Sequence, residues 1–154
     1  MRNNNSKIKI IDGGASRQKS VFNALKCVSN DYVIIHDGAR PLIKSGTISQ
    51  VMDKVLECNA VSVMTKTTDT IKEVDEAGRI IKTIDRSKLY NTQTPQAFKT
   101  DIIRNAHNEL IAGNFTDDAS MLEELDIPVF IIIGSYTNIK ITTKSDLDFA
   151  KLYI

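Results

Sequence analysis

Short apolar segments alternate along the chain with segments of helical periodicity. Runs of four to eight apolar or alternating residues are typical of strands, and apolar residues three and four positions apart are typical of helices. This pattern predicts strands at Lys7–Asp12, Tyr32–His36, Ala60–Thr65, Pro128–Ile133 and Asn138–Thr142. It predicts helices over residues 20–28, 45–59, 99–113 and 145–154, with Ser45 or Thr47 and Ser145 as caps and Gly113 as an end. Apolar strands separated by helices indicate an α/β fold, with a mostly parallel sheet and helices on both faces.

One segment breaks this alternation. The stretch "DTIKEVDEAGRIIKTIDR" holds two alternating runs around "DEAG", which predicts a projecting β-arm within residues 68–95. The following "DRSKLYNTQTPQAF" has no local periodicity and is interpreted as an irregular segment. Because an arm must bury its apolar face on something, we expect it to contact a second subunit, most simply in a homodimer.

Length and composition describe an ordinary globular chain. Its 154 residues suit a single domain over residues 1–154, and its net charge of +1 gives no basis for binding nucleic acid or a membrane surface. No apolar run has the length of a membrane span. Cys27 and Cys58 lack a CxxC spacing and are predicted to be buried reduced thiols, so we expect a cytoplasmic protein.

Candidate chemistry follows two of the predicted strands. The stretch "DGGASRQKSV" has glycines that permit close backbone approach and hydroxyls at a helix start, which suits a phosphate, sugar or base contact, although a capped turn explains it equally well. In "HDGARP", Asp37 is a possible Mg²⁺ ligand and Arg40 a possible anion contact. The alternative is that Asp37 pairs with Arg40 only to close a turn. A His-Asp metallohydrolase is disfavoured, because His107 is the only other histidine and lies on a predicted helix.

Two further stretches are ambiguous taken alone. In "FTDDASMLE" the acids follow a cap-like Thr116, and the helix dipole accounts for them. In "TNIKITT", Lys140 is either a guard of a sheet edge or an anion contact.

Together, however, six stretches in this order closely resemble one family, the 2-C-methyl-D-erythritol 4-phosphate cytidylyltransferases of isoprenoid biosynthesis. They are "GGASRQKSVFNAL", "VIIHDGARPLI", "DTIKEV", "IDRSKLYNTQTPQAF", "TDDASMLE" and "NIKITTKSDLDFA". The resemblance runs from about Lys7 to the end of the chain and implies a Rossmann-like nucleotidyltransferase fold. The implied reaction joins a sugar-alcohol phosphate to the α-phosphate of CTP with release of pyrophosphate, in the presence of Mg²⁺.

The resemblance also implies roles on the nucleotide side. Gly13 and Ser20 are expected to contact the cytidine end of CTP. Asp37, Gly38 and Ala39 are expected to lie beside the nucleotide, with Asp37 as metal ligand and catalytic residue.

Arg40 is expected to organise this loop as a catalytic residue. On the acceptor side, Lys140 is expected to reach the phosphate of the alcohol, also as a catalytic residue. Thr70, Arg86 and Thr94 are expected to bind the same phosphate, with Thr70 and Arg86 supplied by the arm of a partner subunit.

The chain departs from this family at its start. Family members begin with a strand and a glycine-rich loop that bears an arginine and a lysine and holds the triphosphate. We therefore expect the fold to be truncated at its N-terminus relative to the family, and the chain alone to be weak or inactive. Two alternatives stay open: a ribitol 5-phosphate cytidylyltransferase, and a non-catalytic dimerising remnant.

Overall fold

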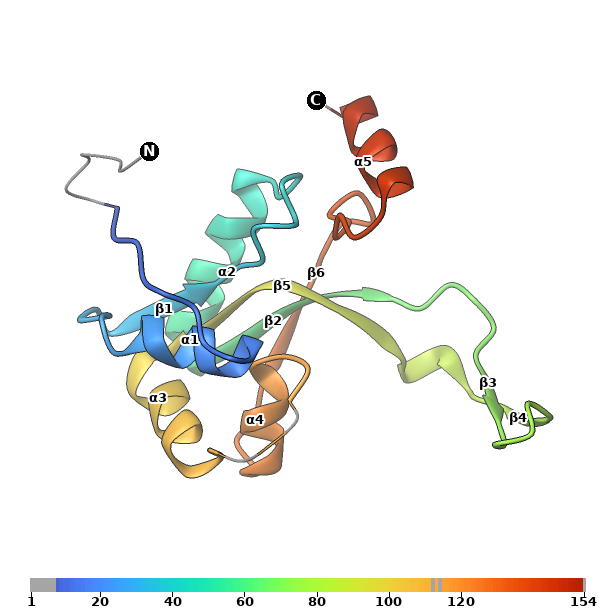
Figure 1. Cartoon of the computed structure of the whole chain (residues 1–154), viewed down its shortest axis with the longest axis horizontal. Helices are drawn as coiled ribbons and strands as arrows, with labels where there is room; N and C mark the ends of the chain where they lie inside the picture. Colours follow the sequence, from blue (N-terminus) through green and yellow to red (C-terminus); the bar gives the residue numbers. More distant parts are fainter. Residues whose placement is uncertain (1–7, 112, 114, 154) are drawn as a thin grey trace.

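The computed structural model describes residues 8–111, 113 and 115–153, and its centre is a mixed sheet (Figure 1). The sheet has four strands in the order β1-β5-β2-β6. They are β1 (Tyr32–Ile35), β5 (Tyr90–Lys99), β2 (Ala60–Lys66) and β6 (Phe130–Ile133). β5 pairs antiparallel with β1 and β2, whereas β2 and β6 are parallel. Every strand except β5 therefore runs in one direction, as the α/β prediction requires.

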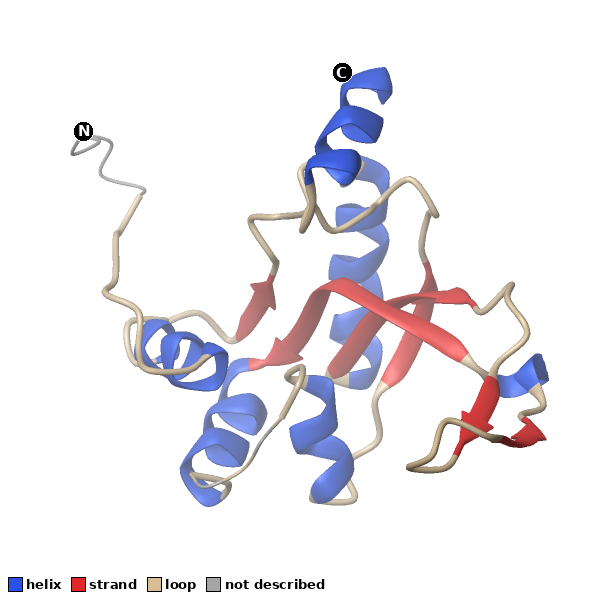
Figure 2. Cartoon of the chain, turned by 45° about the vertical axis from the view of Figure 1, so that its right-hand side comes forward, coloured by secondary structure: helices blue, strands red, loops and turns tan. Residues whose placement is uncertain are grey.

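Helices cover both faces of this sheet (Figure 2). On one face α2 (Ser45–Cys58) buries Val51 and Val55 against Val61, Val63 and Ala97.

The other face carries α1 (Arg17–Leu25), α3 (Thr100–Glu109) and α4 (Ala119–Glu124). Its buried cluster includes Leu25 and Phe98. Ala97 and Phe98 lie on opposite faces because successive strand residues alternate, so one strand contributes to both cores. The predicted two-sided α/β class is confirmed.

The predicted arm is also present. β3 (Lys72–Val74) and β4 (Ile80–Thr83) form an antiparallel hairpin, followed by the 3-10 helix η1 (Arg86–Lys88). Figure 1 shows the hairpin standing far from the four-stranded sheet. Its turn contains Gly78 at φ 79°, a conformation that favours glycine.

Three predicted segments differ from the structure. Residues 8–12 do not form a strand, because no described strand lies beside them to pair with, and Ile8 and Ile10 remain exposed; Lys7 lies outside the described residues. Asn138–Thr142 is likewise not a strand. The segment interpreted as irregular contains all but the last residue of β5, the ten-residue strand that pairs with both β1 and β2.

Several predicted helix ends are wrong by a few residues. α2 begins after Lys44 without a side-chain cap, and α3 ends at Glu109 rather than near Gly113. α5 (Lys144–Ala150) is capped by Thr143 instead of Ser145, because the Thr143 hydroxyl and the Asp146 carboxylate each accept a backbone N–H of the other residue. A 3-10 helix, η2 (Lys151–Tyr153), follows α5.

The cysteines and the helix lengths complete this comparison. Cys27 is exposed and Cys58 half-buried, both as free thiols, so the prediction of two buried thiols is wrong for Cys27 and only partly met by Cys58. Within the described residues, none of the helices is both long and apolar enough to span a bilayer.

Candidate active site

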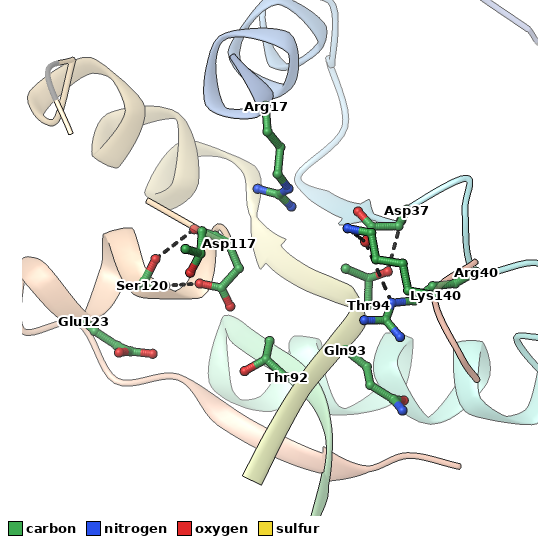
Figure 3. A pocket seen from close by; sticks show the side chains of 11 residues that line it. Arg17, Asp37, Arg40, Thr92, Gln93, Thr94, Asp117, Ser120, Glu123 and Lys140 are labelled. Atoms are coloured by element: carbon green, nitrogen blue, oxygen red, sulfur yellow. Dashed lines mark hydrogen bonds and ion pairs between the residues drawn. The ribbon is translucent and has the colours of Figure 1, made fainter. Parts of the chain in front are cut away.

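A pocket of about 420 Å³ opens beyond the end of β1 and beside β5 (Figure 3). Its lining includes basic side chains at one end and acidic side chains at the other, with hydroxyl and amide groups between them. The lining residues are Arg17, Asp37, Arg40, Thr92, Gln93, Thr94, Thr116, Asp117, Ser120, Glu123 and Lys140.

At the basic end of the pocket, the side chains of Lys140 and Arg40 both face the carboxylate of Asp37. Its Oδ2 atom lies 2.9 Å from Lys140 Nζ and 3.7 Å from Arg40 Nε. Burial lowers the pKa of the Arg40 guanidinium, against the effect of Asp37, but an arginine stays protonated in either case. Both alternatives for "HDGARP" are therefore visible at once: Asp37 does pair with Arg40, and the pair faces a pocket.

A hydrogen-bond network holds this loop on β5. His36 Nε2 lies 3.0 Å from the Arg40 carbonyl, which can only accept, so Nε2 carries the proton. In the neutral ring Nδ1 then accepts from the Thr94 hydroxyl at 3.0 Å, and the Thr94 oxygen accepts the Asp37 N–H at 3.0 Å. The network explains why His36 and Asp37 directly follow the strand: the imidazole ties the turn to neighbouring β5.

The segment that carries Lys140 joins the same loop. The Ile141 N–H donates to the Ala39 carbonyl at 2.8 Å, and Arg40 Nη1 donates to the Asn138 carbonyl at 2.8 Å. These two contacts bring residues about a hundred positions apart into one site.

The acidic end is built around the start of α4. Buried Gln96 donates to Asp117 Oδ2 at 2.7 Å and accepts the N–H groups of Asp118 and Ala119 at 3.1 and 3.3 Å. Asp117 Oδ1 accepts the Ser120 N–H at 3.0 Å. Gln96 therefore fixes the direction in which this acidic turn faces the pocket.

Asp118, which is buried, links α1 to this turn through Arg17. Its carboxylate accepts Arg17 Nη2 at 2.7 Å, and His107 Nε2 lies 3.4 Å from its other oxygen. Burial raises the pKa of Asp118, but the contacts with His107 and Arg17 outweigh burial, so the pKa is lowered. Asp118 is thus held as a carboxylate, and Arg17 is held at the pocket.

The structure brings only some of the predicted site residues together. Asp37, Arg40, Thr94 and Lys140 line one pocket. Gly38 and Ala39 belong to the same loop, and a Cβ on Gly38 would meet no atom within 4 Å, so the backbone there is open to a ligand.

The residues predicted for the cytidine end are not among those that line the pocket. The Ser20 hydroxyl accepts the Gly14 N–H and donates to the Ser16 carbonyl, both at 2.9 Å, so it shapes the glycine turn. Gly13 lies in the same turn, where a Cβ would come 3.3 Å from Ser20 Oγ.

Thr70 and Arg86 are exposed on the arm, away from this pocket, and the Arg86 guanidinium contacts the Thr68 carbonyl. Within this chain they do not meet the other predicted residues. Their assignment to a partner's site remains a prediction.

Sequence reasoning missed Arg17, Asp117 and Ser120 as pocket residues. Arg17 lies inside the quoted glycine-rich stretch, and the acids of "TDDAS" were attributed to a helix dipole. The contact that places Asp117 and Ser120 at the pocket comes from Gln96. Gln96 lies on β5, a strand that the sequence pattern did not predict.

Mg²⁺ suits this pocket only as an ion shared with a ligand. Among the residues that the structure describes, no group of three His, Cys, Asp or Glu side chains could hold a metal ion. Asp37 offers a carboxylate whose Oδ2 already contacts Lys140. Mg²⁺ commonly binds one or two carboxylates together with substrate phosphates, so Asp37 fits that arrangement.

Fold and site together define a class: an α/β protein with a charged pocket beyond the carboxyl end of a sheet strand, where such folds commonly bind ligands. A family model described as 2-C-methyl-D-erythritol 4-phosphate cytidylyltransferase (IspD) matches residues 2–154. The chain belongs to this family.

Relatives agree with this assignment. The 2-C-methyl-D-erythritol 4-phosphate cytidylyltransferase of Prochlorococcus marinus (strain MIT 9312) is 48% identical over 152 residues, covering 96% of this chain and 67% of the relative. The protein of the same name from Syntrophus aciditrophicus (strain SB) is 43% identical over 149 residues, covering 94% and 64%. The chain thus spans about two thirds of the length of the curated relatives that it matches.

Solved structures show the same fold. The crystal structure of the Francisella tularensis enzyme of this name superposes with a TM-score of 0.87 at 32% identity, covering 100% of this chain and 75% of the other. The crystal structure of the Thermus thermophilus enzyme gives a TM-score of 0.85 at 31% identity, covering 93% and 71%. The Rossmann-like fold expected from the resemblance is confirmed.

Proposed function

We propose that this chain forms the acceptor side of a cytidylyltransferase site that transfers CMP from CTP to 2-C-methyl-D-erythritol 4-phosphate. The observation that carries the proposal is the cluster of Asp37, Lys140 and Arg40 in one pocket, within a chain of this family. A phosphate oxygen of the alcohol attacks the α-phosphorus of CTP, the bond from that phosphorus to the bridging oxygen breaks, and pyrophosphate leaves.

The chain's own residues serve this reaction by binding and orienting charge. Lys140 and Arg40 neutralise the attacking phosphate, and Thr94 holds the loop that presents them. Asp37 would hold Mg²⁺, which supplies charge neutralisation to phosphate oxygens when bound. Charge neutralisation and in-line positioning are the main demands of such a transfer.

On the nucleotide side we assign the backbone of Gly38 and Ala39 to contact with the phosphates or ribose. The turn shaped by Gly13 and Ser20 would hold the cytidine end. The open space above Gly38 supports this assignment.

We further propose a homodimer in which the arm of each subunit supplies Thr70 and Arg86 to the partner's pocket. The support is that both residues are exposed on a hairpin that leaves its own core, and that Val74 and Ile80 on this hairpin are 54% and 64% exposed.

The described residues alone provide little net positive charge for a triphosphate. Arg17, Arg40 and Lys140 in the pocket are matched by Asp37, Asp117 and Glu123. We therefore propose that the 154-residue chain by itself is weak or inactive, and that a glycine-rich segment with basic residues completes the site.

The test combines turnover with ligand binding. Pyrophosphate release is measured with CTP, Mg²⁺ and methylerythritol phosphate, for the chain alone and with a polypeptide that carries a glycine-rich nucleotide-binding segment. Ribitol 5-phosphate replaces the acceptor in a parallel assay. Release only in the supplemented reaction, and only with methylerythritol phosphate, is expected. A preference for ribitol phosphate, or no release in any mixture, would contradict the proposal.

A first prediction concerns Lys140. Lys140→Ala should weaken binding of methylerythritol phosphate by about ten- to a hundredfold, because a charge-assisted hydrogen bond contributes about 1.5–3 kcal/mol. Isothermal titration calorimetry measures the effect. Lys54→Ala is the matched control, since Lys54 forms an exposed ion pair with Glu57 on α2, and its affinity should equal that of the unmodified chain. Equal affinities for the two variants would remove Lys140 from the site.

A further inference from the structure

Asn138 is a buried polar residue outside the predicted site and outside the pocket lining. It is only 2% exposed. Its side-chain Nδ2 donates to Gln93 Oε1 at 3.0 Å and to the Thr94 carbonyl at 2.9 Å. Because a main-chain carbonyl only accepts, this orientation of the amide is unambiguous.

The backbone around Asn138 holds the basic end of the pocket. Its carbonyl accepts Arg40 Nη1 at 2.8 Å, and Lys140, two residues further on, contacts Asp37 at 2.9 Å. One residue therefore contacts β5 through its side chain and Arg40 through its main chain.

The neighbouring residues are fitted to this contact. Gln93 Nε2 donates to the Ser135 carbonyl at 3.0 Å, which leaves Gln93 Oε1 facing Asn138. A Cβ on Gly134 would come within 2.7 Å of that oxygen and 2.5 Å of Val63 Cγ1, so glycine is required for the chain to pass this close.

We infer that Asn138 is a positioning residue, which fixes Lys140 and Arg40 around Asp37 so that they can meet a phosphate together. An aspartate here would turn a carboxylate toward the Gln93 and Thr94 oxygens, and the segment would move away from β5. The identity of the phosphate ligand rests on the proposed function, whereas the positioning of Lys140 does not.

The test compares Asn138→Asp with the unmodified chain by two readouts. Calorimetry gives the affinity for methylerythritol phosphate, expected to fall about tenfold. Acetic anhydride labelling, read by mass spectrometry as Lys140 relative to Lys54, is expected to rise about two- to fivefold, as on the loss of a half-exposed ion pair. Val55→Ala, in the core on the α2 face, is the control for general destabilisation and should leave both readouts unchanged.

Each outcome decides the inference. Unchanged affinity together with unchanged Lys140 labelling would overturn it. The inference would also fail if Val55→Ala, at a similar decrease in Tm, changed both readouts as much as Asn138→Asp does. If Asn138→Asp does not fold, Gln93→Leu, which removes one of the two amide contacts, is measured instead and should shift both readouts in the same direction. If the unmodified chain does not bind methylerythritol phosphate, the proposed function fails, and the labelling ratio still tests the positioning.

Discussion

Asp118 links three helices through one buried carboxylate. Its side chain is 1% exposed and contacts Arg17 of α1 and His107 of α3. Asp118→Asn leaves Arg17 without its anionic partner, and we expect the free energy of unfolding at pH 7 to fall by about 1–3 kcal/mol. Urea denaturation measures this change.

The pH dependence of that loss gives a sharper test. The pKa of Asp118 is lowered in the folded state, so its contribution is fully present above the ordinary carboxyl pKa and is lost as pH falls through the lowered value. The stability difference between the unmodified chain and Asp118→Asn should therefore be constant above about pH 5 and shrink below about pH 4. Asp101→Asn is the control, since Asp101 is 78% exposed in its ion pair with Arg104. A difference that grows on acidification would contradict this account.

At the scale of elements, α4 depends on a side chain from the sheet. The helix has six residues, and its N-cap residue Asp118 makes no side-chain cap; Gln96 accepts the N–H groups of Asp118 and Ala119, and Asp117 accepts that of Ser120. Gln96→Leu should speed hydrogen exchange of the α4 amides and lower stability by about 1–3 kcal/mol, because buried donors lose their partner. Gln50→Leu, on the exposed side of α2, should change neither. Exchange in α4 that is no faster than in the Gln50 variant would show that Gln96 does not stabilise the start of the helix.

The same strand marks the limit of what periodicity could predict. β1 and β6 were found because their residues form continuous apolar runs, and β2 because apolar residues predominate in it. β5 was missed because Gln93, Thr94 and Gln96 occupy buried positions in it, where hydrogen bonds to the pocket and to α4 replace apolar contacts. Residues 8–12 show the opposite error, since an alternating pattern forms a strand only where a neighbour offers its hydrogen-bonding edge.

For the site, too, the sequence revealed local patterns but not the contacts between distant segments. "HDGARP" and Lys140 could be predicted because charged residues follow apolar strands or stand among apolar neighbours. The sequence could not predict that these two segments lie in one pocket, because that depends on the hydrogen bonds of Asn138 and on the contact between Ile141 and Ala39. Such contacts leave no periodic trace in a sequence.

At the scale of the whole molecule, the arm is one part whose apolar side chains the described chain leaves exposed. Ile80 and Ile81 point to opposite sides of the hairpin and are 64% and 56% exposed. A lone two-stranded hairpin is at best marginally stable in water, so we expect a second subunit to cover it.

This expectation sets the last prediction. The unmodified chain should sediment as a dimer of twice 17.1 kDa, and Ile80→Ser with Ile81→Ser should weaken the dimer at least about a hundredfold. The loss is large because burying an isoleucine contributes about 1.5–3 kcal/mol and a twofold interface contains each residue twice. Analytical ultracentrifugation over a dilution series measures the constant, with Met52→Ser on α2 as the control at 53% exposure. The circular dichroism of the arm variant should match the unmodified core, because the hairpin lies outside both buried clusters. A chain that stays monomeric at every concentration would contradict the proposed dimer. An arm variant that dimerises as tightly as the Met52 control would contradict the proposal that the arm carries Thr70 and Arg86 into the partner's pocket.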